Sequence, residues 1–404
     1  MYLKILFIFF FLPLFARNAG CQVGPDGQAV PVTLNVKPRI IPAAEQPEAY
    51  LPILRNKKVG LVVNQTARVG EIHLLDHLIA EKIQVTRIFA PEHGFRGDAS
   101  AGEKISDGKD QKTGIQVISL YGKVHKPTPA HLGDLDVLVF DIQDVGCRFY
   151  TYLSTLYYCI EACAENGIPI VVLDRPNPNG DYVAGPILTP DFVSFVGIVP
   201  VPVVHGCTLG EMALMINGQG WHKAPSKADL TVIQVKNYSH SDIYELPVPP
   251  SPNLPNYQSV RLYPSLCFFE ATSASIGRGT EFPFQVIGGT LPSLGEFSFT
   301  PVNMPGIAVN PVNMNKVCYG VDLRSVDPVP PFTLRYFLDF YNKYPSPGQF
   351  LTNERWFNLL AGTDALVRDI RAGKSEAEIV ESWHAGLDAY KSIRRNYLLY
   401  PDFE

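Results

Sequence analysis

The chain has 404 residues, of which 46% are hydrophobic and 18% are charged. These proportions are ordinary for a globular protein, and the length favours two domains over a single core. The formal net charge of −5 provides no basic field, so nucleic acid is excluded as an expected partner.

The N-terminal segment, residues 1–21, predicts a secretory signal. An early lysine is followed by an apolar run from Ile5 to Phe15, which is too short to span a bilayer as a stable helix. The stretch Ala19-Gly20-Cys21 resembles the end of a bacterial lipobox, in which the cysteine is lipidated after cleavage. We therefore expect Cys21 to be the lipidated residue.

One residue departs from the lipobox pattern and leaves an alternative open. Asn18 stands where a leucine-like residue is usual, so plain cleavage near Ala19 is the other interpretation. Residues 22–44 carry proline and glycine without hydrophobic periodicity, which predicts a tether. We expect an exported lipoprotein of the periplasm or cell envelope, held at the membrane only by its lipid anchor.

Predicted strands and helices alternate from about residue 50 onward. The strands are nearly continuous apolar runs, which is typical of a parallel sheet covered by helices on both faces. The expected strands are 58–65, 84–90, 115–122, 136–144, 168–180, 201–206 and 229–235, and the expected helices are 73–82, 128–135, 152–167 and 208–218.

This alternation predicts an α/β fold with a Rossmann-like, doubly wound parallel sheet over residues 45–265, as the catalytic domain. The glycine fingerprint G-x-G-x-x-G does not follow the first strand, where VVNQTARVG stands instead. A dinucleotide site is therefore poorly supported.

The remaining residues, 266–404, predict a smaller, mixed α/β C-terminal domain. One strand is expected at 315–326, and helices at 332–344 and 355–373. The last helix opens with a capping box that joins Ser375 to Glu378 and continues through IVESWHAGLDAYKSIRRNYLLY.

Six cysteines follow Cys21, and none forms a C-x-x-C or zinc-binding spacing. Cys159 and Cys163 lie four residues apart on one predicted helix face among apolar residues, which predicts small buried side chains. We expect neither a metal nor a cofactor.

Polar and charged side chains follow several predicted strands at the point where each strand ends. Ligands of open parallel sheets bind outside these carboxyl ends, so the residues are expected to form one site. Each alone could cap backbone or hold a turn, but their presence at every one of these strand ends favours a site. They are Glu92 and His93, then Asp141, Gln143, Asp144 and Arg148, then Asp174, Arg175 and Asn177, and finally His205 before a helix that contains Glu211.

Several longer motifs resemble one family, once catalogued as DUF1343. The motifs are APEHGFRGDASAGE, SLYGKVHKPTPAHL, VLVFDIQDVGCRFYTYLSTL, VVLDRPNPNGD, VPPSPNLPN and GRGTEFPFQVIGG, and the likeness runs in order from Lys58 to the C-terminal NYLLYP. Members are exo-β-N-acetylmuramidases of glycoside hydrolase family 171, which remove terminal N-acetylmuramic acid (MurNAc) from the non-reducing ends of peptidoglycan fragments. The resemblance implies a Rossmann-like domain, a smaller C-terminal domain and a cleft between them.

The resemblance also implies a catalytic residue, because Glu92 in PEHG matches the catalytic glutamate of the family. The segment FFEATSASIGRGTEFPF departs from the usual pattern, nearer to EGTNxSEGRGTTxPF. The departures are Ala271, Ser273, Ile276 and Glu281, whereas Glu270, Arg278 and Gly279 are kept. These changes bear on substrate preference more than on the chemistry.

Glycoside cleavage needs an acid that protonates the leaving oxygen and a group that stabilises positive charge at the anomeric carbon. We expect Glu92 to be the acid. The second role is open among Asp144, Asp141, Glu270, Glu161 and the acetamido oxygen of the substrate, and we favour Asp144, because Glu161 lies inside a predicted helix. The lactyl carboxylate of MurNAc calls for a guanidinium, and Arg96, Arg148 and Arg278 are the candidates.

The predicted site therefore has two catalytic residues, Glu92 and Asp144. Glu92, Asp144, Asn177 and His205 are expected to share one cleft at the carboxyl edge of the sheet, with Arg278 reaching in from the C-terminal domain. The substrate would be a peptidoglycan fragment such as MurNAc-GlcNAc. The residues predicted to bind it are His93, Arg96, Asp141, Arg148, Tyr150, Asn177, His205, Glu270 and Arg278.

Two other functions stay open. A non-catalytic lipoprotein that binds muropeptides could use the same fold, since fold alone does not decide function. The second is a nucleotide-dependent enzyme of the Rossmann class, which the missing glycine fingerprint disfavours.

Overall fold

The computed structural model describes residues 21–23, 29–31, 37–92, 94–95 and 108–404. Residues 1–39 and 40–404 are separate compact units. In the first unit, β1 (Cys21–Val23) and β2 (Ala29–Pro31) pair antiparallel, from the predicted lipidation site into the predicted tether. The predicted signal segment before Cys21 lies outside the described residues.

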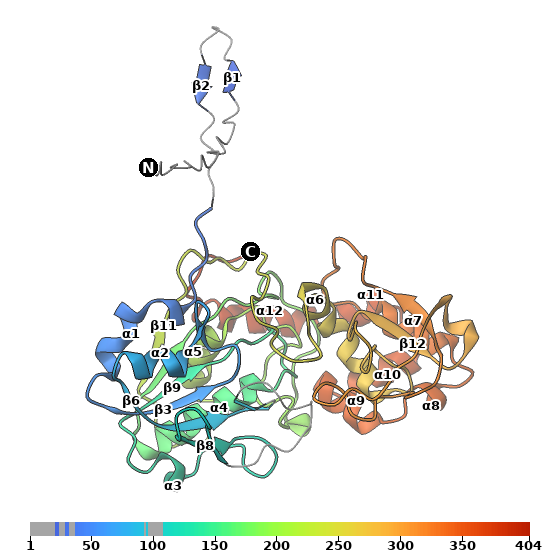
Figure 1. The fold of residues 1–404 in the computed structure, drawn as a ribbon. Coiled ribbons are helices and arrows are strands. Elements are labelled where there is room, and N and C mark those ends of the chain that lie inside the picture. The colour runs from blue at the N-terminus through green and yellow to red at the C-terminus, as the bar shows by residue number, and fades with distance from the viewer. Residues whose placement is uncertain (1–20, 24–28, 32–36, 93, 96–107) are drawn as a thin grey trace, which may run out of the picture. The chain divides into compact units, whose positions relative to one another are not determined.

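A seven-stranded sheet is the centre of the second unit (Figure 1). Its order is β11-β10-β9-β3-β6-β8-β7, and every neighbouring pair is parallel except β7 with β8. Leaving out β7, this is the order 6-5-4-1-2-3 of a doubly wound sheet, and the predicted Rossmann-like fold is confirmed. The strands are β3 (Lys58–Val63), β6 (Gln84–Ala90), β7 (Gly108–Lys109), β8 (Gln116–Ser119), β9 (Val137–Asp141), β10 (Ile170–Leu173) and β11 (Leu230–Ile233).

Alternate residues of the strands enter two different cores, because successive side chains of a strand point to opposite faces. Val137 and Val139 of β9 join one core with helices α1 (Pro47–Leu54) and α2 (Leu74–Ala80). Leu138 and Phe140 join the other with α4 (Tyr152–Asn166) and α5 (Leu209–Gln219). The sheet is therefore covered on both faces, which explains why its strands read as continuous apolar runs.

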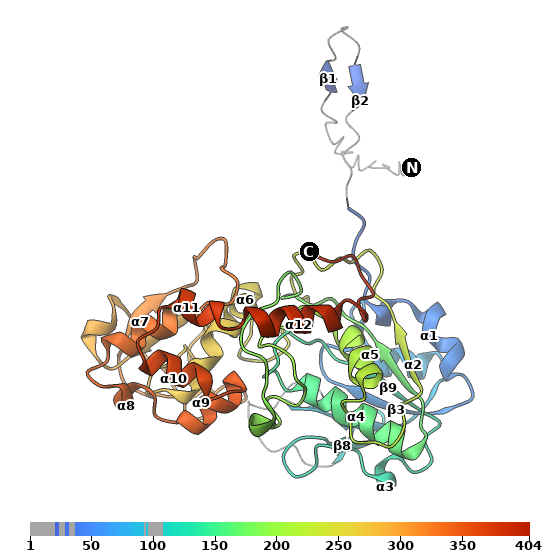
Figure 2. The same cartoon turned by 180° about the vertical axis from the view of Figure 1, so that it is seen from behind.

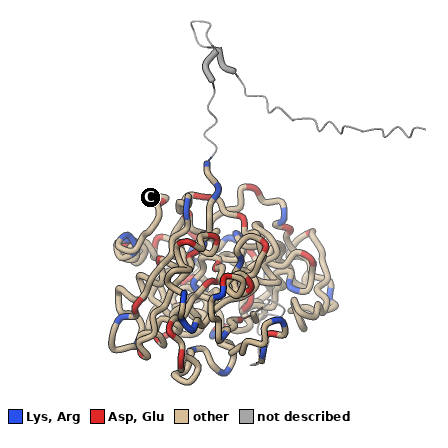
Figure 3. The backbone as a smooth tube through the Cα atoms, turned by 60° about the vertical axis from the view of Figure 1, so that its left-hand side comes forward, with Lys and Arg blue, Asp and Glu red and all other residues tan. Residues whose placement is uncertain are grey.

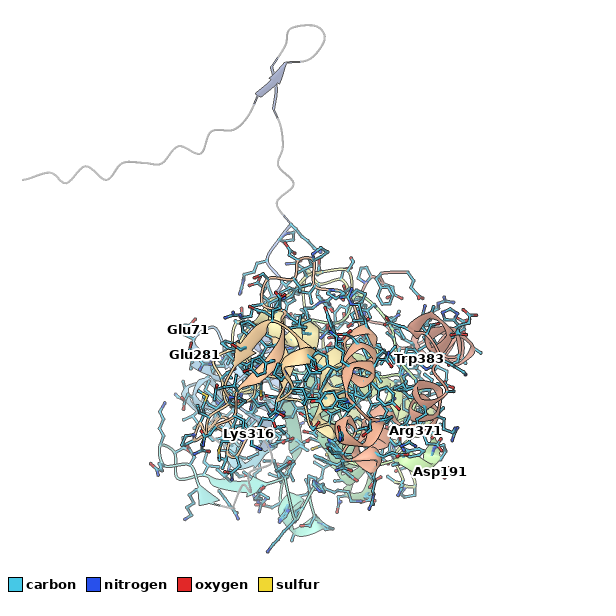
Figure 4. All side chains as sticks on the ribbon, turned by 90° about the vertical axis from the view of Figure 1, so that its right-hand side faces the viewer. Glu71, Asp191, Glu281, Lys316, Arg371 and Trp383 are labelled. Atoms are coloured by element: carbon cyan, nitrogen blue, oxygen red, sulfur yellow. The ribbon has the colours of Figure 1, made fainter. Side chains whose placement is uncertain are left out.

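The smaller part of the unit follows α6 (Tyr257–Leu266) and the short 3-10 helix η3 (Cys267–Ala271). An antiparallel sheet, β12-β14-β13, packs with helices, so the predicted mixed α/β domain is present (Figure 4). In that view Arg371 and Trp383 lie on the helical side, and Glu281 on the other. The elements are β12 (Val286–Gly289), β13 (Phe297–Phe299), β14 (Cys318–Asp322), α7 (Arg335–Lys343), α8 (Pro347–Phe350), α9 (Glu354–Ala361), α10 (Ala365–Arg371) and α11 (Glu376–Glu381).

The last helix, α12 (His384–Arg394), returns to the Rossmann-like part, where Figure 2 shows it beside α5. The Tyr390 hydroxyl donates to the His205 carbonyl at 2.7 Å, and the Arg394 guanidinium donates to the Gly206 carbonyl. The C-terminal segment of the predicted second domain thus makes its contacts with the first.

Three predicted elements differ from the structure. Residues 201–206 form no regular strand, and Val204 makes only single bridges to Cys147 and Ala184. Proline at positions 200 and 202 removes two backbone donors from this segment. The predicted helix 355–373 is divided at Gly362, whose φ of 72° ends α9 in a left-handed cap. The final helix is likewise divided after α11, although its predicted capping box at Ser375 and Glu378 is confirmed.

Small elements complete the Rossmann-like part: η1 (Ala43–Glu45), the hairpin β4 (Arg68–Val69) with β5 (Ile72–His73), α3 (Pro129–Leu132) and η2 (Pro190–Phe192). Figure 3 shows that basic and acidic residues are both scattered over the second unit. None of the helices in the described part of the chain has the length and apolar character needed to cross a membrane.

Candidate active site

A cavity of about 740 Å³ is lined by residues from both the Rossmann-like part and the C-terminal part. Glu92, Tyr121 and Tyr150 line it from the first part, and Glu270 and Arg278 from the second. The volume suits a sugar-sized ligand, since pockets for small molecules usually measure about 300–1,000 Å³.

Glu92 reaches the cavity because β6 ends two residues before it. The chain turns between Pro91 and Gly94, where the Gly94 amide donates to the Pro91 carbonyl at 3.1 Å and Gly94 adopts a φ of 79°. A left-handed conformation of this kind favours glycine. The Thr151 hydroxyl donates to Oε2 of Glu92 at 2.7 Å, so the carboxyl group is oriented by the residue that precedes α4.

Tyrosine side chains surround Glu92. The Tyr152 hydroxyl approaches the Glu92 carbonyl at 3.4 Å, and the Tyr150 hydroxyl donates to the Pro250 carbonyl at 3.0 Å. Burial, followed by the negative charge of Glu92, raises the pKa of Tyr121, and the charge of Glu270 raises it further. Tyr121 therefore stays neutral and lies within electrostatic reach of both carboxylates.

Glu270 and Arg278 form an ion pair at the cavity wall. Nη2 of Arg278 lies 2.6 Å from Oε1 of Glu270, and the two side chains are 27% and 23% exposed. The guanidinium also lies over the ring of Phe284, 5.0 Å from its centroid. Because both groups are partly exposed at the cavity, a ligand carboxylate can approach Arg278 while Glu270 keeps its own partner.

Glycines on both sides of Arg278 allow the chain to pass through a crowded place. Gly277 and Gly279 have φ angles of 82° and 81°. A Cβ atom at Gly277 would lie 2.7 Å from the Phe282 carbonyl oxygen, and one at Gly279 would lie 2.4 Å from the Val302 carbonyl oxygen. Larger residues at positions 277 and 279 would clash with these carbonyl oxygens, so both positions require glycine. The backbone path that the glycines allow places Arg278 at the cavity.

The chain matches known family models over most of its length. Residues 59–258 match the family model "Exo-beta-N-acetylmuramidase NamZ, N-terminal", and residues 261–400 match the C-terminal model of the same name. The chain belongs to the NamZ family of exo-β-N-acetylmuramidases. The predicted family and its enzyme class, glycoside hydrolase, are thereby confirmed.

One curated relative and two solved structures illustrate the NamZ likeness. The peptidoglycan beta-N-acetylmuramidase NamZ of Bacillus subtilis (strain 168) is 38% identical over 372 residues, which are 87% of this chain and 89% of the relative. A DUF1343 family protein from Bacteroides fragilis NCTC 9343 superposes with a TM-score of 0.83 at 45% identity, and a second from that organism with 0.79 at 29%. Each match covers 90% of this chain and 100% of the solved one.

The structure brings four of the predicted site residues to the same cavity: Glu92, Tyr150, Glu270 and Arg278. His93 and Arg96 lie outside the described residues. The other predicted residues do not line this cavity, and the expectation that Asp144, Asn177 and His205 share a cleft with Glu92 is not met.

Asp144 lies in a separate, small cavity of about 10 Å³, which Asn177 also lines. Oδ1 of Asp144 accepts from the Gly146 amide at 2.7 Å, and Oδ2 has no partner among the described residues. Burial raises the pKa of Asp144 to about 7. The side chain of Asn177 bonds to backbone, since its amide donates to the Cys207 carbonyl at 2.9 Å. This position gives no support to Asp144 as the second catalytic group.

Three other predicted residues are fully buried and hold the fold together. The Arg148 guanidinium donates to four carbonyl oxygens, including those of Leu360 and Ala361, and so joins the two parts of the unit. Asp141 forms an ion pair with Arg175. His205 accepts from the Cys207 amide, and burial followed by the charge of Arg394 lowers its pKa to about 3. None of the three is placed to contact a ligand in the 740 Å³ cavity.

At the carboxyl ends of β3 and β9, where doubly wound folds often bind nucleotides, polar groups of the chain bond to one another. Oδ1 of Asn64 accepts from the Thr66 backbone amide and side-chain hydroxyl, and the Thr66 hydroxyl accepts from the Gln143 amide. The Asn64 amide donates to the Tyr152 hydroxyl at 3.0 Å. This arrangement counts further against a nucleotide-dependent enzyme.

Sequence reasoning missed several cavity residues. Thr151 lies in the quoted motif but adjoins no predicted strand end. Tyr121 lies at the end of the predicted strand 115–122, within the motif SLYGKVHKPTPAHL. Trp356 and the loop 307–312 come from the second part of the unit and carried no signal beyond their apolar character. A search for aromatic residues within the family motifs would have found Tyr121.

Proposed function

We propose that this chain is an exo-acting β-N-acetylmuramidase that releases MurNAc from the non-reducing ends of peptidoglycan fragments, with Glu92 as the general acid. The observation that carries the proposal is the position of Glu92 in a chain of the NamZ family. Its carboxyl is oriented by Thr151 on a cavity that also exposes an ion-paired arginine.

The chemistry needs two proton transfers, one from Glu92 and one back to it, and one water molecule. Glu92 protonates the glycosidic oxygen while the bond from that oxygen to the anomeric carbon breaks. The hydroxyl of water then becomes bonded to the anomeric carbon, directly or after attack by the acetamido oxygen of the substrate, and the remaining proton of water restores Glu92. Thr151 stabilises the carboxylate form of Glu92 between these steps, because its hydroxyl donates a hydrogen bond to Oε2.

Glu270 is the described carboxylate that shares the cavity with Glu92, and it is therefore a better candidate than Asp144 for stabilising positive charge at the anomeric carbon. Arg278 is the candidate for the lactyl carboxylate, since Arg148 is buried and makes its hydrogen bonds to four carbonyl oxygens. Together the two residues would distinguish MurNAc from N-acetylglucosamine (GlcNAc), which lacks the lactyl group.

The test uses two disaccharides with opposite sugar order. The protein should release MurNAc from MurNAc-GlcNAc and from a chromogenic β-MurNAc glycoside, and it should leave GlcNAc-MurNAc intact. Sugars released from each substrate are separated and quantified by chromatography with mass detection. Binding of MurNAc without hydrolysis would contradict the proposal and favour the non-catalytic binding protein.

We also propose that the chain is exported and lipidated at Cys21, because an apolar run precedes the Ala19-Gly20-Cys21 stretch. Cys21→Ala should yield a soluble or unprocessed form. Fractionation of cells fed a labelled fatty acid measures both anchoring and lipidation. Absence of label on the wild type, with unchanged fractionation of the variant, contradicts the proposal.

A further inference from the structure

A cluster of aromatic rings lies at the cavity on the side of Tyr121. His125 and Phe195 lie with ring centroids 4.1 Å apart, and Tyr121 is 6.1 Å from Phe195. All three line the cavity, and Tyr158 of α4 packs against His125 and Phe195 without lining it. We call Tyr121, His125 and Phe195 the aromatic platform.

The aromatic platform is held by backbone contacts. Ser194 and Gly197 exchange backbone hydrogen bonds of 2.8 and 3.1 Å on either side of Phe195. The Ser154 hydroxyl of α4 donates to the Phe195 carbonyl at 2.7 Å. The ring of Phe195 therefore projects from a closed turn fixed to a helix, so little ordering is needed when a ligand packs on it.

The exposure of the aromatic platform separates it from the core. Each of its three side chains is partly exposed, whereas Phe149, at 2%, and Phe284, at 1%, line the same cavity from the core. Aromatic side chains supply large apolar surfaces at ligand sites, and the apolar face of a sugar ring can pack on such a surface.

The aromatic platform also lacks a formal positive charge at the cavity. Burial lowers the pKa of His125, so its ring is neutral at neutral pH. Nζ of the neighbouring Lys126 pairs with Glu161 and Glu165 at 2.8 Å. An anionic sugar therefore gains less here than beside Arg278, and a neutral sugar fits better.

We infer that the aromatic platform is the subsite for the sugar that leaves, a neutral N-acetylhexosamine attached to MurNAc. This inference rests on the proposed function, in which Glu92 protonates the oxygen between two sugars and must lie between their subsites. Tyr121 belongs to the aromatic platform, lines the same cavity as Glu92 and has its pKa raised in part by the charge of Glu92, so the aromatic platform adjoins the acid. Arg278 and Glu270 hold the MurNAc side, which leaves the aromatic platform for the leaving sugar.

The test compares two substrates that differ only in the leaving group. MurNAc-GlcNAc fills both subsites, whereas β-MurNAc fluoride leaves the second subsite empty. Phe195→Leu should lower kcat/KM for the disaccharide by roughly tenfold, as expected for loss of an aromatic contact, and should change fluoride hydrolysis less than about twofold. Phe195→Trp, which keeps an aromatic ring, should retain most of the disaccharide activity.

Phe297→Leu is the matched control, because Phe297 is a partly exposed ring stacked on Phe299, 6.0 Å away, and lies outside the cavity. It should leave both rates unchanged. Two results for Phe195→Leu would overturn the assignment of this subsite: an equal loss of kcat/KM on the two substrates, or full activity on the disaccharide. Either result would leave the proposed function intact. A wild-type protein that hydrolyses neither substrate would contradict the proposed function itself.

Discussion

The polar residues predicted to form one site at the sheet edge differ in what their hydrogen bonds connect. Asp144 and His205 accept from backbone amides two residues further along the chain, and Asn177 donates to the Cys207 carbonyl. Glu92 instead meets a threonine hydroxyl and a tyrosine on a 740 Å³ cavity shared with Glu270 and Arg278.

The difference shows that position at a strand end does not by itself indicate a catalytic role. A polar group at the sheet edge is available to a ligand only if the surrounding loops leave space beside it. At Asp144 the remaining space is about 10 Å³, which is room for about one water molecule. At Glu92 the C-terminal part of the chain provides a second wall instead of closing the gap.

The strongest test of this contrast is Glu92→Gln, which keeps the shape of the side chain but removes the transferable proton. Turnover of MurNAc-GlcNAc should fall by about 10²–10⁴-fold, while a nitrophenyl glycoside, whose leaving group needs less protonation, should lose less. Steady-state kinetics on both substrates measure the difference. Glu71→Gln, at an exposed glutamate (Figure 4), serves as the control.

Equal losses on the two substrates would instead mean that Glu92 positions the sugar. Disaccharide activity near the wild-type rate would remove Glu92 from the mechanism altogether.

Glu270→Gln tests the second carboxylate of the cavity. Removing its negative charge should lower kcat by about 10²-fold, the magnitude typical for loss of one electrostatic contact to a transition state. Glu281→Gln is the matched control, since this exposed glutamate lies in the neighbouring segment but outside the cavity (Figure 4). If Glu270→Gln leaves kcat unchanged, Glu270 does not stabilise the transition state, and its role is to position Arg278 through their ion pair.

Arg278→Met tests recognition of the lactyl group. A charged hydrogen bond contributes about 1.5–3 kcal/mol, so affinity for MurNAc should fall by about 10–100-fold, whereas affinity for GlcNAc should change little. Calorimetric titration of each sugar gives the ratio. Arg324→Met is the control. Arg324 forms an ion pair with Asp322, with an N–O distance of 2.7 Å, and does not line the cavity. Parallel losses for both sugars would argue against carboxylate binding by Arg278.

Asp144→Asn should have the smallest effect on activity, within about threefold of the wild type, because the side chain lies outside the active-site cavity. A loss as large as that of Glu92→Gln would return Asp144 to the mechanism. The same variant should reveal a change in stability.

The folded-state pKa of Asp144 is raised to about 7, from an ordinary value of 3.8. The folded protein therefore keeps a proton that the unfolded chain releases, so the wild type loses stability as the pH rises between these values. At about 1.4 kcal/mol for each unit of pKa, the loss is of order 4 kcal/mol at most. Asp144→Asn has no carboxyl group to titrate and therefore does not lose stability in this way. The melting temperature of the variant minus that of the wild type should be larger at pH 8 than at pH 5. A difference independent of pH would mean that Asp144 is ionised throughout.

The sequence alone determined the doubly wound sheet, because the apolar strand pattern reflects burial on both faces, which is a local property. It also selected Glu92 as the candidate acid, through a family motif that β6 and the turn at Gly94 place at the sheet edge. Neither result needed knowledge of distant contacts.

Only the tertiary structure decided which strand-end residues reach a ligand. Arg148 and Arg278 look equivalent in the sequence, yet Arg148 is buried against carbonyls of Leu360 and Ala361, more than 200 positions away, whereas Arg278 lies on the cavity. The two acids differ likewise in exposure to the cavity: Glu270 lines it, whereas Asp144 is buried outside it. Whether a side chain faces ligand or backbone depends on how loops from distant segments pack around it, and no periodicity or motif in a single segment records that packing.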